Sequence, residues 1–138
     1  MDKQAVAKKV VDTMFENDYF SQWLGIERVT VEPGHCVLKM KIRKEMLNGF
    51  SIAHGGIAYS LADSALAFAS NSHGRKSLSI ETSISHTVSI HEGDEIVATA
   101  KEENLTNKIG IYYITITKDS TTIALFKGTV YRTSKEWF

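Results

Sequence analysis

The segment from Ile57 to Ser72 constrains the fold of this chain more than any other. It is rich in Ala and Leu and contains no Pro, which favours a helix. Its apolar residues occupy nearly all sides of that helix, so other elements must cover it. His73-Gly74 follows, and a glycine is typical of a helix C-terminus. The segment therefore predicts a buried helix at the centre of the protein.

The remaining segments supply the elements that would bury this helix. Residues 3–20 carry apolar side chains at helical spacing, and 26–32 and 37–43 predict a β-hairpin around the Pro33-Gly34 turn. Residues 44–53 are irregular. Four further strands are expected, at about 78–88, 94–104, 110–118 and 122–132. This order predicts an α+β fold in which about six mostly antiparallel strands wrap around a central helix, with an N-terminal helix.

The length and charge of the chain exclude several classes of protein. Its 138 residues predict a single domain, 1–138, and 43% hydrophobic residues suffice for a core. The 16 basic residues balance the 16 acidic ones, which excludes a nucleic-acid binder that works by bulk charge. Cys36 is the only cysteine, so no intrachain disulfide and no cysteine-rich zinc site is expected. No apolar run could span a membrane and no signal peptide is recognisable, so we expect a cytoplasmic protein without a membrane partner.

Asp63 stands in the middle of the apolar helix. One interpretation places it on a narrow polar stripe with Ser60, Ser64 and Ser70, where water solvates the carboxylate. Most helical aspartates are solvated, so the residue alone favours this stripe. The other interpretation makes Asp63 functional, because a buried carboxylate is costly unless it is paired. Partial burial would then raise its pKa and make it a better base near neutral pH.

His54-Gly55-Gly56 precedes the helix and contains the elements of an oxyanion hole. Glycines let a ligand approach the backbone, and the first N–H groups of a helix have no internal partner and favour negative charge. Such donors stabilise the oxyanion that forms when a carbonyl is attacked. The alternative is a flexible start to the helix, with His54 as an ordinary loop histidine. Asn48, before Gly49, either caps its own turn or holds a water or a substrate carbonyl.

The spacing of Gly55 and Asp63 constrains how they could act together. Eight positions on a helix correspond to about 12 Å. A catalytic carboxylate must come within about 3 Å of the reacting atom or act through one water. The two residues of one chain therefore cannot easily serve the same carbonyl. If both are catalytic, two antiparallel copies of the helix must lie side by side, which predicts an obligate dimer with two equivalent sites.

The segment from Asn48 to Gly56, continued by Ser60-Leu61-Ala62-Asp63, resembles the hotdog-fold thioesterases. The resemblance is greatest to the acyl-CoA thioesterases of the phenylacetic acid degradation PaaI type. It covers nearly the whole chain and includes residues 16–18, 67–72 and 124–128. It implies a helix wrapped by an antiparallel sheet, at least a homodimer and often a homotetramer, and hydrolysis of acyl-CoA thioesters at the dimer interface.

The resemblance also implies roles for individual residues. Asp63 is the catalytic carboxylate, as general base or nucleophile, and the Gly55 N–H polarises the thioester carbonyl. His54 supports this loop and the carbonyl, Asn48 positions water or the thioester, and Ser79 lies near the position of an assisting hydroxyl in some members. Coenzyme A, which belongs to the substrate and is not a cofactor, is expected to bind at Gly56, Ser79, Ile80, Glu81, Thr82, Lys108, Ile109 and Gly110. Lys108 and Arg75 are the candidate cations for its phosphates.

The segment from Ser85 to His91 departs from this resemblance. Many relatives have a Pro-Gly or Arg-Pro element there that helps to shape the acyl pocket, and this chain has neither. The acyl group thus stays open between aryl-acetyl and short or medium aliphatic chains. His86 and His91 form no metal-ligand pattern with a cysteine, and His54 and Asp63 are too far apart to share a metal, so no metal is expected.

Two other functions remain open at the level of the sequence. A hotdog hydratase or dehydratase would resemble a pattern with catalytic His and Glu and a proline-rich loop, which a chain with Pro33 alone fits poorly. A non-catalytic acyl-CoA-binding module would leave Asp63 without a reason for its place in the helix. We therefore expect an acyl-CoA thioester hydrolase.

Overall fold

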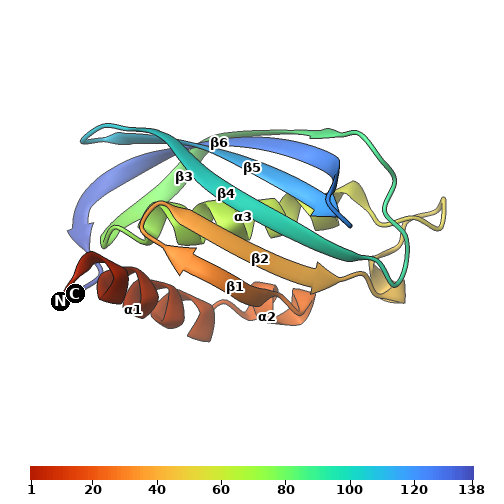
Figure 1. Ribbon diagram of the computed structural model, residues 1–138, viewed down its shortest axis with the longest axis horizontal. Helices are drawn as coiled ribbons and strands as arrows, with labels where there is room; N and C mark the ends of the chain where they lie inside the picture. The colour runs from red at the N-terminus through yellow and green to blue at the C-terminus, as the bar shows by residue number, and fades with distance from the viewer.

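The computed structural model describes residues 1–138 and contains one six-stranded sheet around one long helix (Figure 1). The helices are α1 (Lys3–Glu16), α2 (Tyr19–Leu24) and α3 (Gly55–Asn71), with a short 3-10 helix η1 (Lys44–Met46). The strands are β1 (Glu27–Glu32), β2 (His35–Lys41), β3 (Arg75–His86), β4 (Glu95–Leu105), β5 (Ile109–Lys118) and β6 (Thr121–Glu136). Neighbouring strands are antiparallel, in the order β1-β2-β4-β5-β6-β3. The expected α+β architecture is confirmed.

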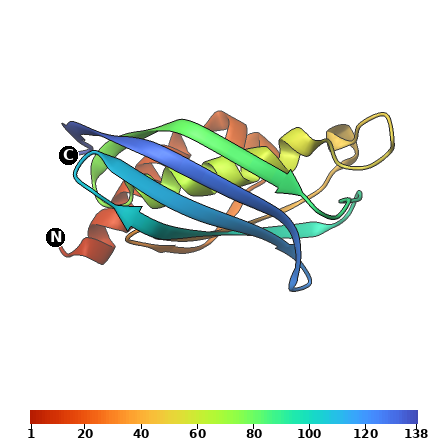
Figure 2. The same ribbon diagram turned by 90° about the horizontal axis from the view of Figure 1, so that it is seen from above.

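The central helix α3 lies in the hollow of the curved sheet (Figure 2). Leu61, Leu66 and Phe68 of α3 are buried in one apolar cluster with the inward-facing residues of the strands. Gly128 on β6 allows the closest approach of helix and sheet, because an added Cβ there would lie 2.5 Å from a methyl carbon of Leu66. Burial of apolar area at this interface stabilises the fold and sets the position of α3.

The predicted N-terminal helix over 3–20 is wrong in its extent. The structure has two helices, because α1 ends at Glu16 and Asp18 begins a new one. The Asp18 carboxylate accepts a hydrogen bond from the Ser21 N–H at 3.0 Å, which is the role of an N-cap residue. The Ser21 hydroxyl lies 2.8 Å from the Ser64 hydroxyl and so ties α2 to the middle of α3.

The ends of the predicted central helix and strands shift by a few residues. α3 begins at Gly55 rather than Ile57, since His54 caps it, so both glycines belong to its first turn. β3 begins at Arg75 and β6 continues to Glu136, because these two residues are still paired. None of the three α-helices combines the length and apolar character that crossing a bilayer requires.

The two edges of the sheet differ in how they are covered. α1 shields β1, because Gln4 donates to the Val31 carbonyl and Arg28 forms an ion pair with Asp12 at 2.6 Å. β3, twelve residues long, pairs only with β6 and leaves its other side open. Ile80 on this strand is 60% exposed. A long, open and partly apolar edge is a surface that another chain can pair with.

Candidate active site

The first turn of α3 leaves one backbone donor free. His54 has φ −58° and ψ 137°, and its Nδ1 accepts a hydrogen bond from the Gly56 N–H at 3.1 Å. The His54 carbonyl accepts one from the Ile57 N–H at 2.9 Å. The Gly55 N–H has no acceptor within the chain. His54 is therefore a helix cap, not a histidine in a flexible segment, and Gly55 offers a donor at the positive end of the helix dipole.

Asn48 lines the same cavity as this donor and caps its own turn, which is one of the two roles that the sequence left open. Its Oδ1 accepts a hydrogen bond from the Phe50 N–H at 2.8 Å, while its backbone N–H donates to the Ile52 carbonyl. Its side-chain nitrogen has no partner in the chain. Asn48 is half-buried, so this nitrogen remains available to a ligand.

A cavity of about 250 Å³ brings these groups together. It is lined by Asn48, Ile52, Ala53, His54, Gly55, Ala58, His86, Thr87, Val88, Ser89 and Ile90. We call it the Gly55 cavity. His86, at the end of β3, faces Gly55 closely enough that an added Cβ on the glycine would lie 3.2 Å from Nε2. From the sequence, His86 was considered only as a possible metal ligand, and no metal was expected. Its position beside Gly55 was missed, because no local sequence signal links the two residues.

Asp63 opens into a different cavity, of about 360 Å³. This Asp63 cavity is lined by Met14, Asp63, Leu66, Ala67, Ser70, Asn71, Lys76, Ser77, Leu78, Ser79, Val130 and Trp137. The carboxylate forms no hydrogen bond or ion pair with the chain. Burial raises its pKa, and the negative charge of Asp18 raises it further. The expected direction of the pKa shift is confirmed.

The predicted solvated polar stripe around Asp63 is wrong for Ser64 and Ser70, whereas Ser60 and Asp63 are half-buried. Ser64 is 9% exposed and bonds to Ser21, and Ser70 is 2% exposed and bonds to the Ala67 carbonyl. The Ser60 hydroxyl donates to the Gly56 carbonyl of its own helix. The neighbouring serines thus have hydrogen-bond partners within the chain, and Asp63 is left as the carboxylate without a partner.

The Gly55 cavity and the Asp63 cavity share no lining residue. Gly55 and Asp63 lie eight residues apart on one straight helix, and each faces its own cavity. Ser79 lines the same cavity as Asp63, whereas Asn48 and His54 line the same cavity as Gly55. One copy of the chain therefore holds two separated halves of the constellation that the sequence predicts.

The residues expected to contact coenzyme A are spread over β3 and the turn before β5. Ile80 and Glu81 are exposed on β3, and the Thr82 hydroxyl lies 2.6 Å from the Tyr59 hydroxyl. Lys108 is exposed, Ile109 is half-buried, and Gly110 is buried under Tyr112 and Val130. Three His, Cys, Asp or Glu side chains that could hold a metal do not gather anywhere in the chain.

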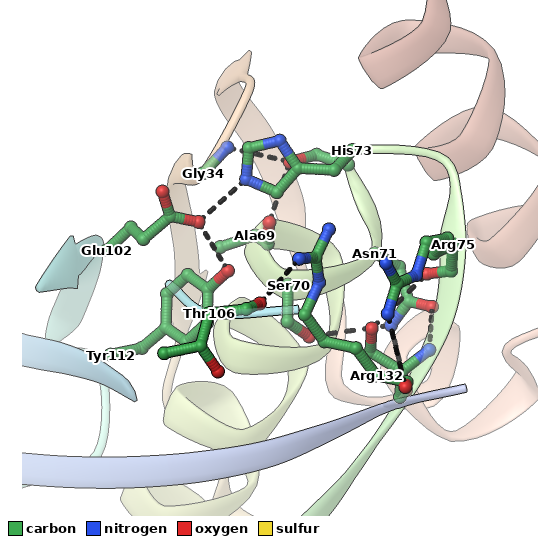
Figure 3. A network of polar contacts seen from close by, with 12 residues as sticks. Gly34, Ala69, Ser70, Asn71, His73, Arg75, Glu102, Thr106, Tyr112 and Arg132 are labelled. Atoms are coloured by element: carbon green, nitrogen blue, oxygen red, sulfur yellow. Dashed lines mark hydrogen bonds and ion pairs between the residues drawn. The ribbon is translucent and has the colours of Figure 1, made fainter. Parts of the chain in front are cut away.

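Arg75 has a structural position that the sequence did not indicate. Its guanidinium donates to the Asn107 side chain at 3.0 Å, to the Asn107 carbonyl, and to the Thr133 carbonyl at 3.1 Å. It also donates to the Arg132 carbonyl at 3.3 Å (Figure 3). These bonds anchor the turn before β5 to the end of β6. Most of its donors are therefore used, and Lys108 is the better candidate for a phosphate.

Comparisons with known proteins found relatives of this chain. The model of the Thioesterase superfamily matches residues 50–124. A protein of Archaeoglobus fulgidus, provisionally named an esterase, is 40% identical over 98% of this chain and 88% of its own length. The acyl-coenzyme A thioesterase PaaI of Escherichia coli is 36% identical over 86% of each chain.

The fold comparison points the same way. The structure of the E. coli PaaI protein from the phenylacetic acid degradation operon superposes with a TM-score of 0.95 and 32% identity, over 98% of this chain and 99% of that one. Similarity of this extent in both sequence and structure identifies the family. The chain belongs to the Thioesterase superfamily and is a hotdog-fold thioester hydrolase of the PaaI type.

Proposed function

We propose that the protein hydrolyses acyl-CoA thioesters in a site built by two copies of the chain. The Gly55 N–H of one copy would face Asp63 of the other copy across the interface. The observation that carries this proposal is the separation of the Gly55 and Asp63 cavities within one chain, next to an open sheet edge. Neither cavity alone contains both the Gly55 N–H and a carboxylate.

The position of the open edge supports this assembly. Tyr59 is midway between Gly55 and Asp63 on α3, and its hydroxyl contacts Thr82 on β3 at 2.6 Å. Thr82 in turn lies about midway between Ser79, in the Asp63 cavity, and His86, in the Gly55 cavity. A two-fold axis beside Thr82 would exchange the two ends, because a two-fold interface places each patch against its counterpart. Pairing of two β3 edges would therefore put each Gly55 cavity next to an Asp63 cavity.

The chemistry follows from these groups. The Gly55 N–H would bind the thioester oxygen and stabilise the negative charge that grows on it during attack. Asp63 would take a proton from the attacking water, or would itself attack the carbonyl carbon to form an anhydride that water then opens. The carbon–sulfur bond breaks and the CoA thiolate leaves, so no strong acid is needed. Asn48 and Ser79 would hold the water or the thioester in place.

The family and the lining of the Asp63 cavity support the proposed substrate class. The E. coli relative is named an acyl-coenzyme A thioesterase. The apolar side chains of Met14, Leu66, Val130 and Trp137 line the same cavity as the carboxylate, and they favour an aryl-acetyl group or a short to medium aliphatic chain. We extend the proposal to CoA binding along β3 and near Lys108, and to a homodimer that can pair into a homotetramer.

Mixed dimers test the shared site directly. Gly55→Pro removes the N–H, and Asp63→Asn removes the base. Each variant alone should have almost no activity on a panel of acyl-CoAs followed with a thiol reagent. Coexpressed in equal amounts, they should recover about a quarter of wild-type activity, because half of the dimers are mixed and each holds one intact site. Absence of recovery in verified mixed dimers would show that each chain works alone.

The interface has its own test. Ile80→Glu places a charge on the open β3 edge, and it should give inactive monomers by analytical ultracentrifugation. Val29→Glu is the matched control, since Val29 is 54% exposed on β1, the other edge strand, and the variant should keep both assembly and activity. An active dimer of Ile80→Glu would place the interface elsewhere.

A further inference from the structure

His86 is an exposed histidine whose side chain has no partner, yet its ring is directed at Gly55. It is the last residue of β3 and forms no hydrogen bond or ion pair through its imidazole. Its Nε2 would lie 3.2 Å from a Cβ added to Gly55, closer than either neighbouring ring carbon. The nitrogen edge of the ring therefore faces the backbone unit that carries the free N–H.

The backbone around His86 keeps this ring in place. His86 pairs with Ala124 on β6, and the Thr87 N–H donates to the Ile123 carbonyl at 3.0 Å. A side chain on a paired strand end is positioned more rigidly than one on a free loop. The side chain contributes no hydrogen bond to the fold, so a purely structural role does not explain where the ring points.

We infer that His86 is a second hydrogen-bond donor to the thioester oxygen, together with the Gly55 N–H of the same copy. This inference rests on the proposed function, because it needs the thioester carbonyl to lie in the Gly55 cavity. Two converging donors are the usual form of an oxyanion hole, and in this cavity Gly55 supplies one backbone donor. His54 cannot be the second through Nδ1, since that nitrogen accepts the Gly56 N–H.

In this role His86 donates a hydrogen bond and does not lose a proton during thioester hydrolysis. Water or Asp63 adds to the carbonyl carbon, and the electron pair of the C=O bond moves to the oxygen. That oxygen accepts hydrogen bonds from the Gly55 N–H and from a protonated Nε2 of His86. When the C=O bond forms again, the C–S bond breaks and the CoA sulfur leaves as thiolate. The His86 proton stays on nitrogen throughout.

Three single variants of the full-length protein test this role. His86→Phe keeps a flat ring beside Gly55 and removes the donor. It should lower kcat about a hundredfold and leave KM within about threefold, because the missing bond strengthens mainly in the transition state. His86→Gln restores a side-chain N–H that cannot transfer a proton, and it should recover most of kcat. His91→Phe is the matched control, because His91 is exposed nearby but does not line the Gly55 cavity, and it should behave as wild type.

The outcomes separate this inference from the proposed function. A His86→Phe enzyme with kcat within about twofold of wild type would overturn the inference, while wild-type activity and its loss in Asp63→Asn would still support the proposed function. A His86→Gln enzyme as slow as His86→Phe would also overturn it, because a neutral donor would then not replace the imidazole. Thermal unfolding of each variant shows whether it is folded, and His86 is exposed, so the fold should tolerate all three changes.

Discussion

Polar side chains at the C-terminal end of α3 are paired, whereas one group at its N-terminal end and one in its middle have no partner in the chain. Asn71 uses both side-chain atoms, because its nitrogen donates to the Ala67 and Ser77 carbonyls and its oxygen accepts from Ser77 and Trp137. By contrast, the Gly55 N–H and the Asp63 carboxylate have no partner in the chain. Paired groups hold the fold together, and unpaired groups near cavities are left to bind a ligand.

The paired end also connects distant segments. Glu102 on β4 accepts the Tyr112 hydroxyl of β5 and lies against His73, both at 2.6 Å (Figure 3). The Ser72 hydroxyl accepts the Gly34 N–H from the β1–β2 turn at 2.8 Å. Burial and the Glu102 carboxylate raise the pKa of Tyr112 above its usual range, so the phenol keeps its proton. This end of α3 therefore acts as an anchor for the sheet, and changes there should affect stability more than catalysis.

The largest expected effect belongs to Asp63. Asp63→Asn should reduce kcat on acyl-CoAs a hundredfold or more, because the amide can neither accept the proton nor attack. A steady-state assay with a thiol reagent measures this loss. A rate within about twofold of wild type would remove Asp63 from the mechanism.

The same substitution should not lower stability. Folding raises the pKa of Asp63, so the resulting stabilisation is complete below the pKa of the unfolded chain and is lost as the pH rises through the folded pKa. At neutral pH the ionised carboxylate thus costs stability, and Asp63→Asn should unfold at the same or a higher temperature. A lower unfolding temperature at pH 7 would mean that the carboxylate has a stabilising partner.

The second-largest expected effect belongs to Gly55, for which two variants form a matched pair. Gly55→Pro removes the N–H at the first helical position, where proline is favoured, and the extended backbone of His54 is compatible with a following proline. Gly55→Ala adds the same Cβ beside His86 but keeps the N–H. We expect kcat of the proline variant to be about a hundredfold below that of the alanine variant. Equal rates would show that the amide does not bind the oxyanion.

A change at the anchored end should give the opposite result. Tyr112→Phe removes the hydrogen bond to Glu102, and it should lower the free energy of unfolding by about 1–2 kcal/mol in urea titrations. The hydrolysis rate should remain within about twofold of wild type. Tyr113→Phe is the control, because Tyr113 is 51% exposed and its hydroxyl has no partner in the chain. A loss of activity without a loss of stability in Tyr112→Phe would break the contrast between the two ends.

The smallest expected effect concerns Asp18. Burial is the main cause of the raised pKa of Asp63, and the Asp18 charge adds to it. Asp18→Asn keeps an oxygen that can cap α2 but removes the charge. The acid limb of the profile of kcat/KM against pH should move to lower pH, with little change in the maximum rate. An unchanged limb would show that Asp18 is too well screened to act on Asp63.

Some elements could be predicted because their local sequence pattern shows which of their residues are buried. α3 is apolar nearly all round, and β2 alternates buried and half-buried residues, so burial is visible in the local pattern. The break at Asn17-Asp18 was missed, because apolar residues on either side continue a helical spacing while the cap depends on one side chain. The anchoring role of Arg75 was also missed, since its acceptors come from β6 and the turn before β5.

For the site, the sequence was enough to name Gly55 and Asp63 and to show that about 12 Å of helix separates them, because helical rise per residue is constant. It could not show which polar groups stay unpaired, since that depends on partners far along the chain. The position of His86 beside Gly55, the two separate cavities and the open edge of β3 arise only when the sheet closes around α3. Local spacing is set by covalent geometry, whereas the neighbours of a side chain are set by how the whole chain packs.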